Sequence, residues 1–338
     1  MRPTLPLLMV GLLLVSVPAN AGFDEITDGS GLELVDSGPL TNWAAYGPGV
    51  AWGDYDDDGD LDVFLTARFD HLGQETAEVL GYLHLSEIPA NHSDQDALST
   101  NSTGQSHLMR NEGDGTFVDV SEQAGVGASG VTTIGATWVD YDGDGDVDLY
   151  LSNYGHADLE NPEGTGSANQ MFVNENGVFR DVTSESNLGN PGHSSASVWV
   201  DYDHDGDMDC YSMNFGMIDE YTGLARAETN ILYRNDGDSN GDGIPEFNDQ
   251  TSEAGVYGHN ENDVTDFETQ IGPALTVVLT GSASPSGQMS LPEGVREDPK
   301  GSGLSWAAVW FDADGDGWED LYVASDFGVS PLYHNNGD

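Results

Sequence analysis

Cysteine is almost absent from this chain of 338 residues, since Cys210 is the only one. A single cysteine excludes any disulfide within the chain. We expect its side chain to be a small buried apolar group and not a reactive thiol. The chain also contains 44 glycines and 14 prolines, which favour turns. A turn-rich chain without disulfides needs another means of holding its loops together.

Basic side chains are scarce as well. The chain has 8 lysine and arginine residues against 60 acidic ones, and its net charge is −52. Nucleic acid is therefore excluded as a partner, because binding to phosphates requires a basic surface. An excess of surface carboxylates instead favours solubility and the binding of cations.

Long apolar runs are confined to the N-terminal region. Arg2 precedes an apolar stretch at residues 5–17, and the small-residue segment at 19–21 follows it. This order is typical of a secretory signal peptide over residues 1–21, and the stretch is short for a membrane-spanning helix. We expect no transmembrane segment, and a mature chain that is secreted, displayed at the cell surface or held in the periplasm.

The most informative pattern that is present is D-x-D-x-D-G-x-x-D. Carboxylates at positions 1, 3 and 5 of such a turn point to one centre, and glycine at position 6 permits the sharp bend. The backbone carbonyl of position 7 and the carboxylate of position 9 complete the roughly six to eight oxygens that Ca²⁺ prefers. The pattern occurs four times, as loop 1 (54–62), loop 2 (140–148), loop 3 (201–209) and loop 4 (312–320).

Ca²⁺ is thus the predicted cofactor. Side-chain oxygens at positions 1, 3, 5 and 9 and the carbonyl at position 7 are the predicted ligands. In chain order these positions are Asp54, Asp56, Asp58, Asp60 and Asp62; Asp140, Asp142, Asp144, Asp146 and Asp148; Asp201, Asp203, Asp205, Asp207 and Asp209; and Asp312, Asp314, Asp316, Trp318 and Asp320.

Two other kinds of loop share part of this pattern. An EF-hand shares positions 1 to 6 but closes with glutamate at position 12, where this chain has Leu65, Leu151, Ser212 and Val323. Solvated acidic turns would leave four aspartates repelling one another in each loop. The residues after each loop alternate with the period of a strand, so the loops are predicted to lie within β-hairpins.

A fifth candidate loop spans residues 238–246 and matches the pattern less well. It has asparagine at position 3 and glutamate at position 9. A plain polar turn explains this segment equally well. Its predicted ligands are Asp238, Asn240, Asp242, Ile244 and Glu246.

A second motif alternates with the acidic loops, at residues 108–126, 171–188 and 232–256. It is typical of a strand, an Asn/Gly turn and another strand. With the two strands around each acidic loop, this makes four antiparallel strands per repeat. The predicted fold is therefore an all-β propeller of four-stranded blades over residues 22–338, with four blades present. Insertions at 67–106, 158–169 and 257–303 are expected on one face, where specificity would lie.

The two ends of the chain match different parts of the repeat. Residues 22–27 resemble the outer strand at 117–121, and residues 332–338 match 108–114. We expect a fragment of a longer protein, with an incomplete ring and an open blade edge. Closure of residues 22–27 onto the last repeat, which would give a four-bladed ring, is the alternative.

Catalytic constellations are not apparent. Residues 192–196 (GHSSA) faintly resemble a nucleophile elbow, which requires a strand-to-helix turn. Here the segment leads into the strand that carries Trp199, so we predict no catalytic residues and no enzyme activity for these 338 residues.

The paired motifs W-x-DYDxDGDxDLY and NxGDGTFxDVT resemble the FG-GAP repeats, also called VCBS repeats, of integrin α-chains and many secreted bacterial proteins. They look most like the cartilage-acidic-protein group, whose members often end in an ASPIC/UnbV domain. The resemblance implies a seven-bladed propeller with Ca²⁺ in the hairpin loops of its blades. It implies no single activity.

Three functions remain open on the sequence. The first is a secreted calcium-binding module for adhesion or for a protein or glycan ligand at the loop face. The second is the non-catalytic propeller of a larger secreted enzyme, such as a polysaccharide lyase or phospholipase. The third is a structural protein of the cell surface.

Overall fold

The computed structural model describes residues 29–32, 49–66, 105–127, 131–155, 167–218, 225–226, 228–258, 304–325 and 330–337. The predicted signal peptide, residues 22–27 and most of the three predicted insertions lie outside these ranges. Within them, the strands form four antiparallel sheets and a short two-stranded ribbon. The fold is all-β, as predicted.

Three sheets have four strands each, in the order of an antiparallel meander. Sheet 1 contains β1 (Val50–Gly53), β2 (Asp62–Leu65), β3 (His107–Asn111) and β4 (Phe117–Asp119). Sheet 2 contains β5 (Thr133–Val139), β6 (Asp148–Asn153), β7 (Gln170–Asn174) and β8 (Phe179–Asp181). Sheet 3 contains β9 (Ser194–Val200), β10 (Asp209–Asn214), β13 (Ile231–Asn235) and β14 (Phe247–Asp249).

Sheet 4 has three strands within the described ranges, and the two-stranded ribbon follows sheet 3's second strand. Sheet 4 contains β15 (Ser305–Phe311), β16 (Asp320–Ser325) and β17 (Leu332–Tyr333). The ribbon contains β11 (Met217–Ile218) and β12 (Ala225–Arg226).

Each acidic loop joins the first strand of its sheet to the second. The pairs β1–β2, β5–β6, β9–β10 and β15–β16 are antiparallel hairpins in which the closing aspartate starts the second strand. The predicted β-hairpin context is therefore confirmed, and the helix–loop–helix context of an EF-hand does not apply.

The sequence did not predict three short helices after the outer strands: α3 (Ser121–Ala124), α4 (Thr183–Ser186) and α5 (Thr251–Ala254). The first residue of each has a hydroxyl that accepts a hydrogen bond from the third strand, as Ser121 Oγ does from Leu108 N at 2.8 Å. Each helix ends at a left-handed residue, as at Gly125. The repeated Asp-x-Ser/Thr with Gly or Asn four residues later was the available signal.

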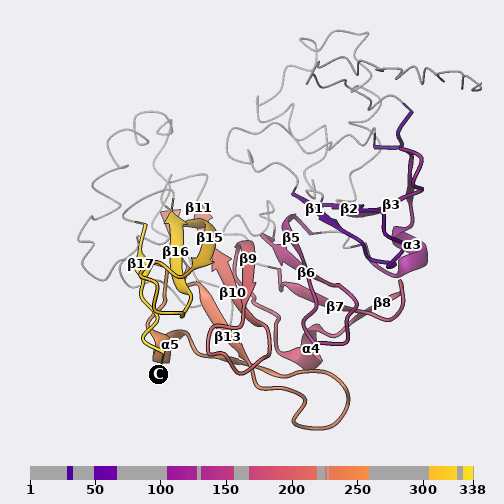
Figure 1. Ribbon diagram of the computed structural model, residues 1–338. Helices are drawn as coiled ribbons and strands as arrows, with labels where there is room; N and C mark the ends of the chain where they lie inside the picture. The colour runs from indigo at the N-terminus through magenta and orange to yellow at the C-terminus, as the bar shows by residue number, and fades with distance from the viewer. Residues whose placement is uncertain are drawn as a thin grey trace, which may run out of the picture.

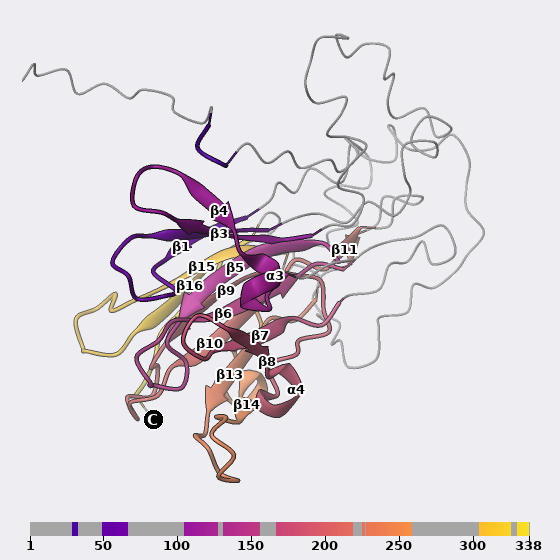
Figure 2. The ribbon, with the colours of Figure 1, turned by 90° about the vertical axis from the view of Figure 1, so that its right-hand side faces the viewer.

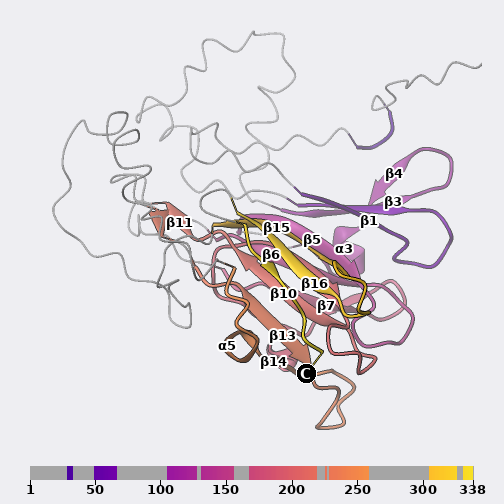
Figure 3. The same ribbon diagram turned by 60° about the vertical axis from the view of Figure 1, so that its left-hand side comes forward.

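The sheets lie side by side in chain order, with their first strands β1, β5, β9 and β15 in contact in series (Figure 1). The apolar core lies between successive sheets, in three clusters. Figure 2 shows the sheets overlapping along the row, and Figure 3 shows β15 and β16 of sheet 4 from the other side. This arrangement of four-stranded sheets is consistent with propeller blades.

Tryptophans of the repeat join one sheet to the next. Trp138 meets Phe64 edge-on, with ring centroids 6.4 Å apart, and Trp199 and Trp310 meet tyrosines of the preceding sheet in the same way. Trp52 is 51% exposed, because no sheet precedes sheet 1 in the described ranges. Trp138 also explains Gly53, where a Cβ atom would lie 2.8 Å from the indole ring.

Cys210 lies fully buried between sheets 2 and 3, which confirms its predicted apolar role. The GHSSA segment runs into strand β9 and not into a helix, so the expected absence of a nucleophile elbow holds at this place. No helix in the described ranges is long and apolar enough to cross a membrane.

Antiparallel order divides the loops between two ends of the sheets. The four acidic loops and the fifth candidate loop, which joins β13 to β14, lie at one end, here called the acidic face. The connections β2–β3, β6–β7, β10–β13 and β14–β15 leave from the other end, here called the opposite face. The predicted insertions therefore attach at the opposite face.

Candidate metal centres

The four acidic loops share one backbone conformation. Glycine at position 6 has a positive φ in every loop, from 93° at Gly59 to 103° at Gly206. Such angles favour glycine, as the sequence predicted. Position 4 is left-handed too, at Asp57, Gly143, His204 and Gly315. That second left-handed position was not predicted, although glycine and aspartate there were a signal.

Hydrogen bonds inside each loop aim the carboxylates inward. Position 5 accepts a hydrogen bond from the backbone N–H of position 7 in all four loops, for example from Asp60 N to Asp58 Oδ1 at 2.9 Å. Position 1 accepts one from position 6 in three loops, as from Gly206 N to Asp201 Oδ2 at 3.0 Å. Each of these carboxylates keeps a second lone pair for another partner.

Carboxylate oxygens converge in every loop. In loops 2 and 3, positions 1, 3 and 9 bring oxygens within 4.8 Å of one another. In loops 1 and 4, positions 1, 3 and 5 do so. Within the described ranges, the side chains at position 7 join no such group, in keeping with the predicted use of their carbonyls. These aspartate clusters could hold metal ions.

The closing aspartate at position 9 is buried in all four loops and its two oxygens have different partners. Asp148 Oδ2 accepts a hydrogen bond from Tyr141 N, at position 2 of its own loop, at 3.1 Å. Asp148 Oδ1 accepts one from Asn174 N, in the turn after β7, at 2.8 Å. Asp62, Asp209 and Asp320 repeat both contacts.

Burial raises the pKa of the closing aspartates in loops 1 to 3, since it outweighs the two backbone hydrogen bonds. The pKa rises to about 6 for Asp62, about 8 for Asp148 and about 7 for Asp209. In loop 4 the hydrogen bonds from Asn335 N and Ala313 N outweigh burial and lower the pKa of Asp320. Loops 1 to 3 therefore hold carboxylates that a nearby positive charge would stabilise.

Several carboxylate oxygens in loops 1 to 3 are buried without any hydrogen-bond donor in reach. They are Asp56 Oδ1, Asp140 Oδ1, Asp201 Oδ1 and Asp203 Oδ1. A buried polar atom without a partner is costly, and a carboxylate more so. A bound cation would supply the partner, so the residues present fit Ca²⁺. It would contribute charge neutralisation and cross-linking of the loop.

The asparagine that opens each Asn/Gly turn is a site residue that the sequence did not assign. Asn111, Asn174, Asn235 and Asn335 each bind the closing aspartate of their own sheet through the backbone N–H. Glycine two residues after Asn111 has φ of 73°, and a Cβ there would lie 2.5 Å from Asp60 Oδ2. The signal was the recurring asparagine with glycine two residues later, or three residues later at Asn174.

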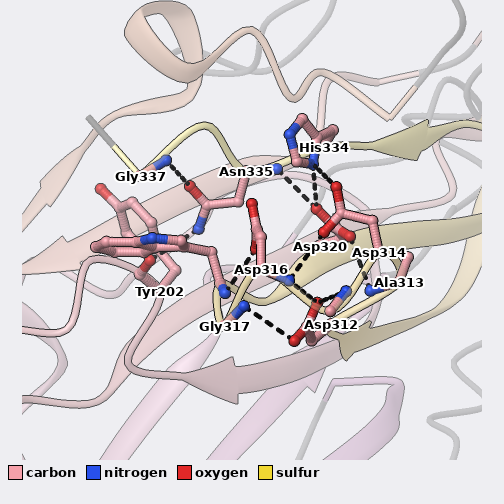
Figure 4. A network of polar contacts seen from close by, with 12 residues as sticks. Tyr202, Asp312, Ala313, Asp314, Asp316, Gly317, Asp320, His334, Asn335 and Gly337 are labelled. Carbon is pink, nitrogen blue, oxygen red and sulfur yellow. Dashed lines mark hydrogen bonds and ion pairs between the residues drawn. The ribbon is translucent and has the colours of Figure 1, made fainter.

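Loop 4 differs because an imidazole lies beside it (Figure 4). His334 Nδ1 lies 2.9 Å from Asp320 Oδ1 and 3.9 Å from Asp314 Oδ2. Its hydrogen bond with Asp320 raises the pKa of His334. Loop 4 also touches loop 3, where the ring of His204 stacks on Trp318 at 4.2 Å. Neither histidine was predicted from the sequence to be a site residue.

The fifth candidate loop has the same internal bonds as loop 4. Asp238 accepts from the backbone N–H groups at positions 4, 5 and 6, and Asp242 Oδ1 accepts from Ile244 N at 3.0 Å. Its end differs, because Glu246 Oε1 accepts from Asn240 Nδ2 at 2.9 Å. The side chain of Ile244 packs in the core between sheets 2 and 3. Metal binding by this loop stays a prediction.

Fold and site together define a class: an all-β protein of side-by-side antiparallel sheets, whose hairpin loops carry aspartate clusters that could hold metal ions. A protein-family model described as an FG-GAP-like repeat matches residues 91–151, a segment that contains β3 to β5, the whole of loop 2 and the first part of β6. No curated protein matches the chain. The resemblance to the cartilage-acidic-protein group stays a prediction.

Proposed function

We propose that this chain is a secreted calcium-binding β-propeller module that binds a protein or glycan ligand. The observation that carries the proposal is the set of buried, partnerless carboxylate oxygens in loops of one repeated conformation. Ca²⁺ suits these loops better than Mg²⁺, because they offer many oxygens in a loop with several left-handed residues and no strict octahedron. The apolar segment at residues 5–17 supports export to a calcium-rich compartment.

The opposite face supports a binding role. A polar hollow of about 710 Å³ lies there at the end of sheet 2, beside Gly127 and Val131 of the connection from sheet 1. This volume is in the usual range of ligand pockets. Hydrogen-bonding side chains that suit sugar hydroxyls or peptide groups line it, among them Asn153, Ser167, Gln170, Asp181, Ser184 and Glu185.

Calcium would serve this face indirectly. The loops at the acidic face fix the first and second strands of each sheet, and the second strands end at the opposite face. Cross-linking one end of a sheet therefore holds the other end in register. The attached insertions would then add specificity on a rigid support.

Contacts around the GHSSA segment support a structural role over a catalytic one. His193 Nδ1 and Glu228 Oε1 are 2.7 Å apart and both side chains are buried. The hydroxyls of Ser194 and Ser195 donate to Asn214 Oδ1 and Ser305 O and not to this histidine. A nucleophile requires a base within hydrogen-bond reach.

A glycan array and a panel of extracellular-matrix proteins, each probed with Ca²⁺ and with a chelator, test the proposal. We expect a ligand that binds in Ca²⁺, is lost in chelator, and binds less to Gln170→Ala. Asn248→Ala, on the outer strand β14 of sheet 3, is the matched control and should bind normally. Calcium binding without any ligand would favour a purely structural protein. Turnover of a bound polysaccharide or phospholipid would favour the enzyme alternative.

A further inference from the structure

The asparagine side chains cross from one sheet to the acidic loop of the sheet before it. Asn174 Nδ2 donates to Tyr55 O, at position 2 of loop 1, at 2.7 Å. Asn235 Nδ2 reaches Tyr141 O of loop 2 at 3.3 Å, and Asn335 Nδ2 reaches Tyr202 O of loop 3 at 2.9 Å. Each asparagine therefore touches two candidate metal loops.

These contacts join all four loops into one hydrogen-bonded series, here called the asparagine relay. Each closing aspartate accepts from position 2 of its own loop. The carbonyl of position 2 accepts from the asparagine of the next sheet, whose backbone N–H binds the next closing aspartate. The relay runs Asp62, Tyr55, Asn174, Asp148, Tyr141, Asn235, Asp209, Tyr202, Asn335, Asp320 and Ala313. Figure 4 shows its last step.

We propose that neighbouring metal sites are coupled through Asn174, Asn235 and Asn335, so that an ion in one loop tightens the site in the loop before it. This inference rests on the proposed calcium binding. An ion in loop 2 fixes Asp148, which fixes Asn174, whose side chain holds the peptide of Tyr55. Tyr55 lies between positions 1 and 3 of loop 1, so its peptide orientation sets the directions of both carboxylates.

The coupling acts through ordering. An empty loop must be ordered against the repulsion of its own aspartates before it can bind. A loop already held by its neighbour pays less of that cost, which raises its affinity. Linkage makes the effect mutual, because an ion in loop 1 raises the affinity of loop 2 by the same factor.

Sheet 1 offers a control that differs in one respect. Asn111 binds Asp62 Oδ1 through its backbone N–H at 2.8 Å, as the other asparagines bind theirs. Its Nδ2 donates to Leu61 O at 3.1 Å, and no acidic loop precedes it in the described ranges. Asn111→Ala should therefore weaken loop 1 without changing the coupling between loops 1 and 2.

The experiment measures Ca²⁺ affinity by calorimetry in the full chain. Loop 3, loop 4 and the fifth loop are silenced by Asp205→Ala, Asp316→Ala and Asp242→Ala, which lie outside the relay. Loop 2 is then silenced by Asp144→Ala. We expect the affinity of loop 1 to fall by roughly 5-fold or more, the lower range of measured site coupling.

The same comparison in an Asn174→Ala background separates the relay from bulk electrostatics. Silencing loop 2 removes a carboxylate and a bound ion, so it also changes the charge near loop 1, but that effect persists without the asparagine. Salt near 0.15 M limits it, since the Debye length is then about 8 Å. In the Asn174→Ala background we expect silencing of loop 2 to lower the Ca²⁺ affinity of loop 1 only slightly. In the Asn111→Ala background we expect the full decrease.

The inference is overturned if silencing loop 2 lowers the Ca²⁺ affinity of loop 1 equally in the Asn174→Ala and Asn111→Ala backgrounds. It is also overturned if silencing loop 2 leaves the affinity of loop 1 unchanged. In both cases Ca²⁺ still binds, so the proposed function stands. Absence of Ca²⁺ binding in the unmodified chain would contradict the proposed function itself. If Asn174→Ala does not fold, loop 1 is compared after silencing loop 2 or loop 3 alone. The relay requires the larger effect from loop 2, and equal effects overturn it.

Discussion

Loops 2 and 4 share six of nine residues and the same left-handed positions but differ in what covers them. Tyr141 of loop 2 is buried against Phe247 of sheet 3, with ring centroids 6.3 Å apart. Ala313 takes the same position in loop 4 and is exposed, since no sheet follows sheet 4 in the described ranges. The pKa of Asp148 rises to about 8 by burial, while hydrogen bonds lower the pKa of Asp320.

This difference shows that the loop sequence sets the turn, whereas the neighbouring sheet sets the electrostatics. Loop 2 has a buried partnerless oxygen at Asp140 Oδ1, but the carboxylates at positions 1, 3 and 5 of loop 4 are exposed to water. A cation therefore relieves more strain in loop 2 than in loop 4.

Calcium removal should have the largest effect. One bound ion adds about 2.7 kcal/mol of stability when its concentration is a hundredfold above Kd. Removal of the ions from several sites by a chelator should therefore lower the melting temperature strongly. Hydrogen exchange should increase more at β5 and β6 than at β15 and β16. An equal rise in both hairpins would remove the distinction between covered and uncovered loops.

Asp148→Ala should abolish the loop 2 site and destabilise the chain by about 1–3 kcal/mol for each of the two backbone N–H groups left without a partner. These groups are Tyr141 N and Asn174 N. Asp146→Ala is the matched control and should keep most of the affinity, because its carbonyl remains. Calcium titration and urea unfolding measure both variants, and similar losses would contradict the assigned geometry.

Acidification should stabilise the metal-free protein. Asp148 has a folded pKa of about 8 because of burial, above its ordinary value of 3.8. Between those values the folded state binds more protons than the unfolded state, so stability falls as pH rises towards 8. Melting temperatures of the chelated chain should therefore be higher at pH 5 than at pH 8.

Asp148→Asn should reduce this pH dependence, because the variant has no carboxyl group to titrate at that position, and Asp62 and Asp209 account for the rest. Asp320→Asn should leave it nearly unchanged, because the folded pKa of Asp320 is low. A chelated chain whose stability falls steadily with acidification would contradict the buried state of the closing aspartates.

Tyr150→Phe and Tyr322→Phe compare the same repeat position in a covered and an uncovered sheet. Tyr150 Oη donates to Leu188 O at 3.0 Å and accepts from Asn169 Nδ2 at 2.9 Å. Loss of this hydroxyl should lower the free energy of unfolding by about 1–3 kcal/mol. Tyr322 is 40% exposed, and loss of its hydroxyl should change the free energy of unfolding by less than about 0.5 kcal/mol. Chemical denaturation of the two variants gives both values.

The sequence predicted those parts of the fold whose cause is local. Glycine at position 6 and the alternation after each loop predicted hairpins because turn and strand chemistry reside in neighbouring residues. Repetition predicted the sheets and the candidate ligands. The strand with Trp199 was predicted in the same way and is confirmed as β9.

Contacts between repeats could not be predicted in this way. The side chain of Asn174 meets Tyr55 across 119 residues, and nothing in the local pattern shows which sheet follows which. His334 occupies the position of Arg110 and Arg234 in its repeat, so only the assembled turn shows that it lies beside Asp320. Asn169, placed within a predicted insertion, is fully buried and bonded to Tyr150.

The central claim is that the acidic loops bind calcium, and counting the ions tests it most directly. Native mass spectrometry of the full chain should be recorded in Ca²⁺, in Mg²⁺ and after chelation. The account predicts at least four Ca²⁺ per chain, one for each of loops 1 to 4, and one fewer in Asp148→Ala. A chain that binds no Ca²⁺, or takes up Mg²⁺ equally well, would contradict it.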